Sequence, residues 1–117
     1  MNIGVLGGTF DPVHLGHLIV AEEARVSLKL ERVLFVPAGT PWLKAARRAI
    51  TEAPHRVAMV KLAIASNPYF ELSTIDVDRP GQTYTVETVA LLQRQLGSSA
   101  EIYFIVGSDG LAEIHLW

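Results

Sequence analysis

Four short hydrophobic stretches alternate along the chain with segments in which apolar residues recur at helical spacing. Residues 3–6, 33–36 and 102–106 are nearly continuous apolar runs, a pattern typical of strands that are buried on both faces of a parallel sheet. In residues 70–75 apolar and polar side chains alternate, so we expect a strand there as well. The pattern therefore predicts four strands separated by helical segments.

Three helices are expected between these strands. The first covers residues 15–30, where charged side chains fill the side opposite the apolar residues. The second runs from Pro54, which suits the first turn of a helix, to about residue 66. The third begins at residue 84 or 85 and ends at residue 96, because Gly97 is a common helix stop.

This alternation predicts an α/β fold in which an open parallel sheet is flanked by helices. We expect residues 1–117 to form a single domain, since domains of roughly 100–150 residues are the most common. Ligands of such folds bind outside the carboxyl ends of the strands. Residues 7–17, 37–44 and 107–110 fall at those ends, and the chemistry is expected there.

Composition narrows the class of protein and of partner. Hydrophobic residues make up 50% of the chain and charged residues 19%, which favours a packed core over disorder. The formal net charge of −2 gives no basic field for nucleic acid. The absence of cysteine excludes disulfides and fits a reducing cytoplasm. No signal-peptide pattern and no membrane-spanning apolar run is present, so we expect a cytoplasmic protein without a membrane partner.

The turn after the first strand carries the densest chemistry. Gly7 and Gly8 let backbone amides approach a phosphate closely, and the helix that follows adds its own unpaired N–H groups. The glycine spacing is not the dinucleotide fingerprint, which argues against a dehydrogenase. His14 and His17 start the helix on one face, with Gly16 between them where a ligand must approach. Two imidazoles so placed can stabilise charge on a phosphoryl group.

Two plainer interpretations of the histidine pair stand beside this one. The side chains could simply be exposed to solvent, or they could bind a metal ion. A histidine-bound metal is disfavoured, because only Asp or Glu residues could complete the ligand set. We therefore expect no metal ion held by the protein itself.

The run from Gly7 to His17 resembles the signature of the H-x-G-H nucleotidyltransferase superfamily, which implies a Rossmann-like nucleotidyltransferase fold. The resemblance implies that His14 and His17 contact the phosphates of ATP and stabilise the pentacoordinate phosphorus, with no covalent intermediate. It further implies that backbone at Gly8, Thr9 and Phe10 lines the phosphate site. Within the superfamily, this version of the signature is typical of bacterial nicotinate mononucleotide adenylyltransferases.

Agreement with that family continues into the second loop and the third helix. Lys44 lies in a segment similar to the family's lysine loop and would reach a phosphate as a flexible point charge; the alternative is an ordinary exposed lysine. Residues 79–85 resemble the segment that binds the nicotinate carboxylate. The resemblance assigns Thr83, Tyr84 and Thr85 to the acceptor; a turn with a threonine helix cap is the alternative, and both can hold together.

The end of the chain carries two further matches. Gly107 and Asp109 match the family's Gly-x-Asp element, in which Asp109 would bind ribose hydroxyls or orient the acceptor; Asp109 could instead cap the next helix. Trp117 matches the tryptophan that stacks on the pyridine ring, and would otherwise be a frayed terminal residue. The family's later segment, which holds the distal phosphates of ATP, has no counterpart here. We therefore expect a chain that lacks the C-terminal part of the fold, exposes apolar surface and tends to form homo-oligomers.

The resemblance implies transfer of the adenylyl group of ATP to nicotinate mononucleotide, with Mg²⁺ carried on the triphosphate. An ionised phosphate acceptor requires no general base, so positioning and charge neutralisation can supply the acceleration. Two alternatives stay open at this point. One is the same transfer to another phosphate acceptor such as pantetheine phosphate. The other is a non-catalytic nucleotide-binding fragment.

Overall fold

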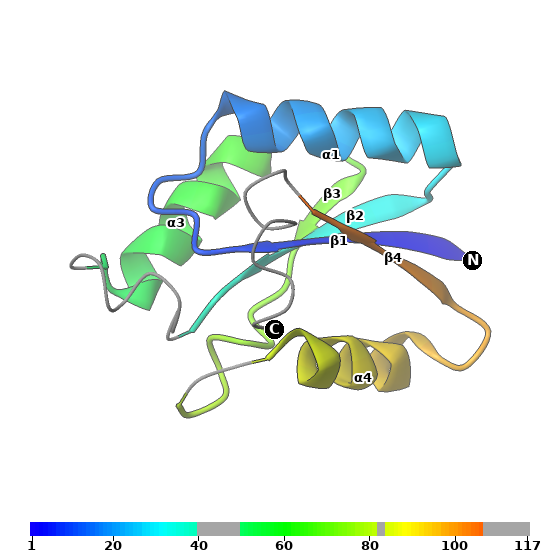
Figure 1. Cartoon of the computed structure of the whole chain (residues 1–117). Helices are drawn as coiled ribbons and strands as arrows, with labels where there is room; N and C mark the ends of the chain where they lie inside the picture. Colours follow the sequence, from blue (N-terminus) through cyan, green and yellow to red (C-terminus); the bar gives the residue numbers. More distant parts are fainter. Residues whose placement is uncertain (40–49, 82–83, 107–117) are drawn as a thin grey trace.

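The computed structural model describes residues 1–39, 50–81 and 84–106 and contains a four-stranded parallel sheet (Figure 1). The strand order is β3-β2-β1-β4, so the first strand lies inside the sheet. All three strand pairings are parallel. The elements follow one another as β1 (Asn2–Gly8), α1 (Leu15–Leu28), β2 (Arg32–Pro37), α3 (Ala53–Ile64), β3 (Phe70–Leu72), α4 (Thr85–Leu96) and β4 (Glu101–Ile105).

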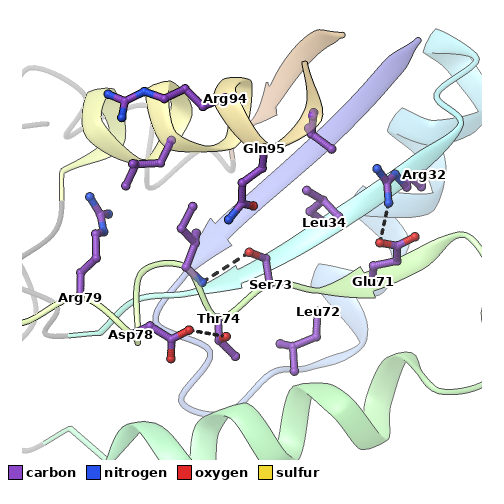
Figure 2. Close-up of a pocket in the computed structure, with 13 residues that line it drawn as sticks. Arg32, Leu34, Glu71, Leu72, Ser73, Thr74, Asp78, Arg79, Arg94 and Gln95 are labelled. Carbon is purple, nitrogen blue, oxygen red and sulfur yellow. Dashed lines mark hydrogen bonds and ion pairs between the residues drawn. The ribbon is translucent and has the colours of Figure 1, made fainter. Parts of the chain in front are cut away.

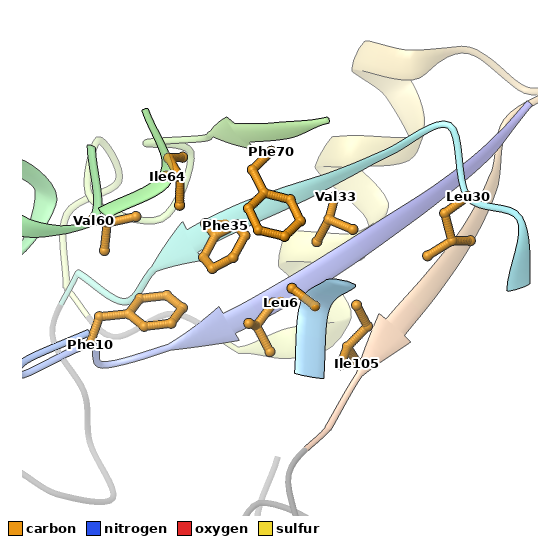
Figure 3. Close-up of a cluster of buried hydrophobic side chains, with 10 residues drawn as sticks. Leu6, Phe10, Leu30, Val33, Phe35, Val60, Ile64, Phe70 and Ile105 are labelled. Carbon is orange, nitrogen blue, oxygen red and sulfur yellow. The ribbon is translucent and has the colours of Figure 1, made fainter. Parts of the chain in front are cut away.

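The sheet is covered on both faces, which confirms the fold class expected from the sequence. Figure 1 shows α1 and α3 on one face and α4 on the other. Side chains of β1 and β2 alternate between two cores, because successive residues of a strand point to opposite faces. The core under α1 and α3 contains Leu6, Phe10, Ala21, Leu30, Val33, Phe35, Val60, Ile64, Phe70 and Ile105 (Figure 3). The core under α4 contains Ile3, Val5, Leu34, Val36 and Leu92.

Aromatic rings form the centre of the first core. Phe35 is fully buried, and its ring centroid lies 5.9 Å from that of Phe10 and 5.0 Å from that of Phe70. Burying a phenylalanine of this kind stabilises a fold by about 2 kcal/mol or more. The three rings therefore join the loop after β1 to β2 and β3, and they fix the base of the loop that carries the predicted phosphate site.

The helix boundaries follow local backbone chemistry. Pro54 lies in the first turn of α3, as expected, and α4 ends at Gly97, which has φ 97°. The prediction that the first helix continues to residue 30 is wrong. The helix ends at Leu28, Lys29 adopts a left-handed conformation with φ 54°, and Leu30 then turns into the core.

The prediction of a strand over residues 70–75 is also too long. β3 ends at Leu72; the N–H of Ser73 still donates to the carbonyl of Phe35 in β2, but from Thr74 onwards the hydrogen bonds lie within a turn. The backbone N–H of Asp78 donates to the carbonyl of Thr74 at 2.9 Å, and the Thr74 hydroxyl donates to the Asp78 carboxylate at 2.9 Å. This turn carries the chain from the sheet towards the start of α4.

The strand order places a topological switch between β1 and β4. The chain runs outward from β1 to β2 and β3, and then returns to form β4 on the other side of β1. In open α/β sheets, the carboxyl edge at such a switch is the usual place for a ligand. No helix in the described residues is long and apolar enough to cross a membrane.

Candidate functional site

The loop after β1 offers backbone donors at the carboxyl edge of the sheet. Thr9 and Phe10 are buried, and Phe10 has a positive φ of 52°. Neither backbone N–H of these two residues donates a hydrogen bond to any residue that the structure describes. Buried amides are nearly always paired in folded proteins, and turns with a left-handed residue commonly direct successive amides at an anion. The loop therefore suits a phosphate group.

His14 and His17 mark the start of α1 and lie against each other. His14 is the N-cap residue, and its ring stacks on that of His17 with centroids 3.8 Å apart. The backbone N–H of His14 donates to Nδ1 of His17 at 3.0 Å, and the N–H of His17 donates to the carbonyl of His14 at 3.0 Å. The expectation that the two imidazoles come together is confirmed, although His14 precedes the helix rather than lying within it.

The hydrogen bond to His17 selects one tautomer of its ring. Because Nδ1 accepts the N–H of His14, the neutral imidazole carries its hydrogen on Nε2. The edge of the Phe10 ring packs near the His17 ring, with centroids 4.9 Å apart and planes at 76°. His17 is thus oriented from two sides, and its Nε2–H is a hydrogen-bond donor at the positive end of the α1 dipole.

Gly16 makes room for the first histidine. A Cβ built on Gly16 would lie 3.0 Å from both Cε1 and Nδ1 of the His14 ring. This is tighter than ordinary van der Waals contact, so a side chain here would push the His14 ring away from His17. The sequence predicted that Gly16 leaves space for a ligand, whereas in the structure that space is next to the His14 ring.

Arg56 was not predicted, yet it connects the loop after β1 to the described parts of the segment between β2 and α3. Its guanidinium donates to the carbonyls of Thr9, Ala38, Gly39 and Thr51. Thr51 is also held from the other side, since its N–H donates to the Asp11 carboxylate at 2.9 Å. A charged residue at position 56 of an apolar helical stripe that includes Val60 and Ile64 is the sequence signal that could have indicated it.

Residues 5–117 match the family model described as cytidylyltransferase-like. The chain belongs to the cytidylyltransferase-like family. The turn from Gly7 to His17 and the start of α4 lie inside the matched residues, so the histidine pair described above is part of the family's domain in this chain.

Curated relatives of this cytidylyltransferase-like chain carry a more specific name. A protein of Thermoanaerobacter sp. (strain X514), 46% identical over 117 residues, is named probable nicotinate-nucleotide adenylyltransferase; the match covers 100% of this chain and 55% of the relative. A protein of Moorella thermoacetica (strain ATCC 39073 / JCM 9320) with the same name is 49% identical over 116 residues, covering 99% and 53%. This chain spans about half the length of the curated relatives it matches.

Solved structures agree in fold with this member of the family. The nicotinic acid mononucleotide adenylyltransferase of Plasmodium falciparum, complexed with APC, superposes with a TM-score of 0.73 at 23% identity, covering 99% of this chain and 55% of that one. The same enzyme complexed with NaAD gives a TM-score of 0.77 at 22% identity, covering 99% and 56%. At these identities the likeness concerns the fold alone.

Several predicted site residues lie outside the described part of the chain. They are Lys44, Thr83, Gly107, Asp109 and Trp117, and their roles stay predictions. Tyr84 and Thr85 are described and start α4. Tyr84 is the N-cap residue and makes no side-chain capping bond. Its carbonyl accepts the N–H groups of Glu87 and Thr88. The expected threonine cap is not found at Thr85, which is already helical.

A cavity of about 700 Å³ lies elsewhere, between α4 and the β2–β3 side of the sheet (Figure 2). The Arg32–Glu71 ion pair and the Thr74–Asp78 hydrogen bond lie along its wall. None of its lining residues belongs to the loop after β1 or to α1, so it is separate from the histidine pair. Among the described residues no group of three or more His, Asp or Glu side chains could hold a metal ion.

Proposed function

We propose that this chain is part of an enzyme that transfers the adenylyl group of ATP to nicotinate mononucleotide, giving deamido-NAD and pyrophosphate in NAD biosynthesis. The observation that carries the proposal is the stacked His14–His17 pair at the N-terminus of α1, next to the amides of Thr9 and Phe10, which donate to none of the described residues. The names of relatives that are 46% and 49% identical supply the acceptor. A cytoplasmic location stays a prediction from the composition.

The chemistry of the transfer matches what these groups can provide. A phosphate oxygen of the acceptor forms a bond to the α-phosphorus of ATP while the bond from that phosphorus to the bridging oxygen breaks, and pyrophosphate leaves. The acceptor oxygen is already ionised at neutral pH, so no proton has to be removed from it. The Nε2–H of His17, the amides after β1 and the α1 dipole would stabilise negative charge on the phosphoryl oxygens.

The remaining roles rest on the resemblance of particular residues. Gly7, Gly8 and Gly16 would keep the backbone close to the triphosphate, and Mg²⁺ would enter with ATP on its phosphate oxygens. Lys44 would approach a phosphate, and Gly107 with Asp109 would hold the nucleotide. The acceptor would bind against Asp109 and Trp117. Its carboxylate would face the backbone of residues 83–85, which are Thr83, Tyr84 and Thr85.

One enzymatic assay and one binding assay test the proposal. Pyrophosphate release is measured with ATP and either nicotinate mononucleotide or phosphopantetheine as acceptor. Release with the first acceptor alone supports the proposal, whereas release with phosphopantetheine alone replaces it with the second reaction. Calorimetry with a non-hydrolysable ATP analogue is run in parallel, because binding without any turnover would identify a nucleotide-binding module instead of an enzyme.

Two histidine variants locate the chemistry. Replacing His17 by Ala removes a donor to the phosphoryl group and should lower kcat by on the order of 10²–10³-fold. His55→Ala is the matched control, since His55 is an exposed histidine in the first turn of α3. An equal rate for wild type and His17→Ala would remove the imidazole pair from the mechanism. Trp117→Ala should weaken acceptor binding more than ATP binding; equal losses would refute its stacking role.

A further inference from the structure

Arg56 is a buried arginine that forms no hydrogen bond with a carboxylate among the described residues. Only 1% of its surface is exposed, which makes it the largest fully buried side chain in the described part of the chain. It projects from α3 on the same stripe as Val60 and Ile64. Burial of a charged group in this way is unfavourable unless every hydrogen bond is satisfied. A conventional core position would be filled by an aliphatic residue, so the arginine requires a separate explanation.

Four carbonyl oxygens from three separate segments surround the guanidinium. Nη1 donates to Thr9 at 2.9 Å and to Ala38 at 2.7 Å, while Nη2 donates to Gly39 at 3.0 Å. Nε donates to Thr51 at 2.6 Å. The planar guanidinium group is suited to such divergent acceptors, which a single ammonium nitrogen could not reach together. One side chain therefore fixes the loop after β1, the end of β2 and the segment before α3 relative to one another.

The charge on Arg56 is retained close to the phosphate loop. Burial lowers the pKa of the Arg56 guanidinium, and the nearby Asp11 carboxylate acts in the opposite direction. An arginine stays protonated under all ordinary conditions. The Asp11 carboxylate is itself bonded to the N–H of Thr51. The loop therefore has a fixed positive charge behind it, on the side of the Thr9 carbonyl.

The hydrogen bonds of Arg56 also determine where backbone amides point. In a trans peptide the carbonyl and the N–H of the same unit point in opposite directions. The Thr9–Phe10 and Ala38–Gly39 bonds are trans, and both carbonyls point at the guanidinium. The N–H groups of Phe10 and Gly39 must therefore point away from it, and neither donates to another described residue. The Gly39 backbone also packs closely against the backbone of Asp76, since a Cβ built on Gly39 would lie 2.7 Å from the Asp76 carbonyl oxygen.

We propose that Arg56 is a positioning residue for the phosphate site, which orients the N–H groups of Phe10 and Gly39 towards the bound triphosphate by holding the opposite carbonyls. Arg56 acts through the backbone and does not touch the nucleotide. The inference rests on the proposed function in one respect, namely that phosphate groups bind at the loop after β1. Its structural part, the fixed geometry of three loops, is independent of any ligand.

The test compares three variants of the whole chain. Arg56→Met removes the donors and keeps an unbranched apolar side chain, and Arg56→Lys keeps the charge with a single nitrogen. Arg32→Met is the matched control, because Arg32 starts β2 at the opposite edge and pairs on the surface with Glu71. Affinity for a non-hydrolysable ATP analogue is measured by calorimetry at a temperature where circular dichroism shows each variant to be fully folded.

We expect the dissociation constant of the analogue to rise on the order of 10–10²-fold in Arg56→Met, because two amide hydrogen bonds to a charged phosphate would lose their alignment. Arg56→Lys should show a smaller rise, and Arg32→Met none. If Arg56→Met does not fold, the comparison of folded Arg56→Lys with wild type decides. Unchanged affinity in a folded Arg56 variant would overturn the proposal, because a role in stability alone does not alter the affinity of molecules that are folded.

Hydrogen exchange of the ligand-free chain separates this inference from the proposed function. The N–H of Ala38 donates to Gly8 and that of Thr51 donates to Asp11, so both report on the braced loops. Their exchange should become on the order of tenfold faster in folded Arg56 variants, while the N–H of Val33, bonded to Tyr69 at the other edge, stays unchanged. Uniform acceleration would overturn the positioning role. A wild-type chain that binds no analogue would instead refute the proposed function. The exchange data would still test whether Arg56 fixes the geometry of the loops.

Discussion

Replacing Thr88 by Val tests the buried network that joins the turn after β3 to α4. The Thr88 hydroxyl donates to the Asp76 carboxylate at 2.7 Å, and the same carboxylate oxygen accepts a bond from Arg79. Thr88 is 3% exposed and Asp76 is 8% exposed. Water therefore cannot readily replace the hydroxyl when it is removed. Valine keeps the shape and nearly the same helix propensity, so the substitution removes only the hydroxyl, which also accepts a bond from Arg79 Nη2 at 2.9 Å.

The expected loss follows from the charge and the burial of the acceptor. A hydrogen bond to an ionised group contributes about 1.5–3 kcal/mol, and Arg79 still holds Asp76 in the variant, so we expect a loss of about 2 kcal/mol in the free energy of unfolding. At roughly 4 °C per kcal/mol for a chain of this size, Tm should fall by about 8 °C. The matched control is Thr74→Val, which removes a hydroxyl-to-carboxylate bond to the exposed Asp78. There water replaces the donor, and the loss should stay below about 0.5 kcal/mol.

Urea unfolding followed by circular dichroism measures both variants under the same conditions. The comparison requires equal m-values, which show that neither variant alters the surface exposed on unfolding. Equal losses for Thr88→Val and Thr74→Val would refute the reasoning, since burial would then have no effect on the value of the bond. A loss at Thr88 that shrinks when Asp76→Asn is already present would confirm that the charged carboxylate is the partner responsible, since asparagine keeps an acceptor oxygen without the charge.

Three further predictions concern the first helix and the end of β2. Hydrogen bonds from Arg25 and Asn67 lower the pKa of Glu22 in the folded chain. The ionised Glu22 side chain therefore stabilises the fold above its unfolded pKa, and this stabilisation is lost as the pH falls through the lower folded pKa. The Tm difference between wild type and Glu22→Gln should shrink on acidification. Gly16→Ala should weaken binding of the ATP analogue measured by calorimetry, because its Cβ would push the His14 ring away from His17. Gly39→Ala should destabilise the chain by about 1–3 kcal/mol in urea titrations, because its Cβ meets backbone that cannot move easily.

The sequence was sufficient for the fold class because its local patterns agree with the tertiary structure. Apolar runs became the buried strands, Pro54 lies in the first turn of α3, and Gly97 ends α4. The third strand was predicted too long for a specific reason. Ser73 and Thr74 continue the alternation in the sequence, but the Thr74 hydroxyl and carbonyl bond to Asp78 within a turn. Local side-chain bonds of this kind compete with strand pairing and are not visible in an alternating pattern.

The candidate site could be predicted in part. The histidine pair was expected because its spacing and the glycines lie within a short segment of sequence. The position of His14 as the N-cap residue of α1 was not expected, since histidine is not among the usual N-cap residues. Arg56 depends on carbonyls that are between five and 47 positions away along the chain. Only the folded chain brings these acceptors together, and a single charge on the apolar stripe was the one local sign of it.

The strictly parallel sheet divides the molecule into two rims with different tolerance of change. At the rim where helices lead into strands, the connections are short: residues 29–31, 65–69 and 97–100. An insertion there would shift a strand against its neighbours and expose core residues. At the opposite rim the strands lead into longer stretches of sequence, residues 9–14, 38–52 and 73–84, before the next helix that the structure describes. Changes of length at the second rim therefore leave the register of the strands intact, whereas changes at the first rim disturb it.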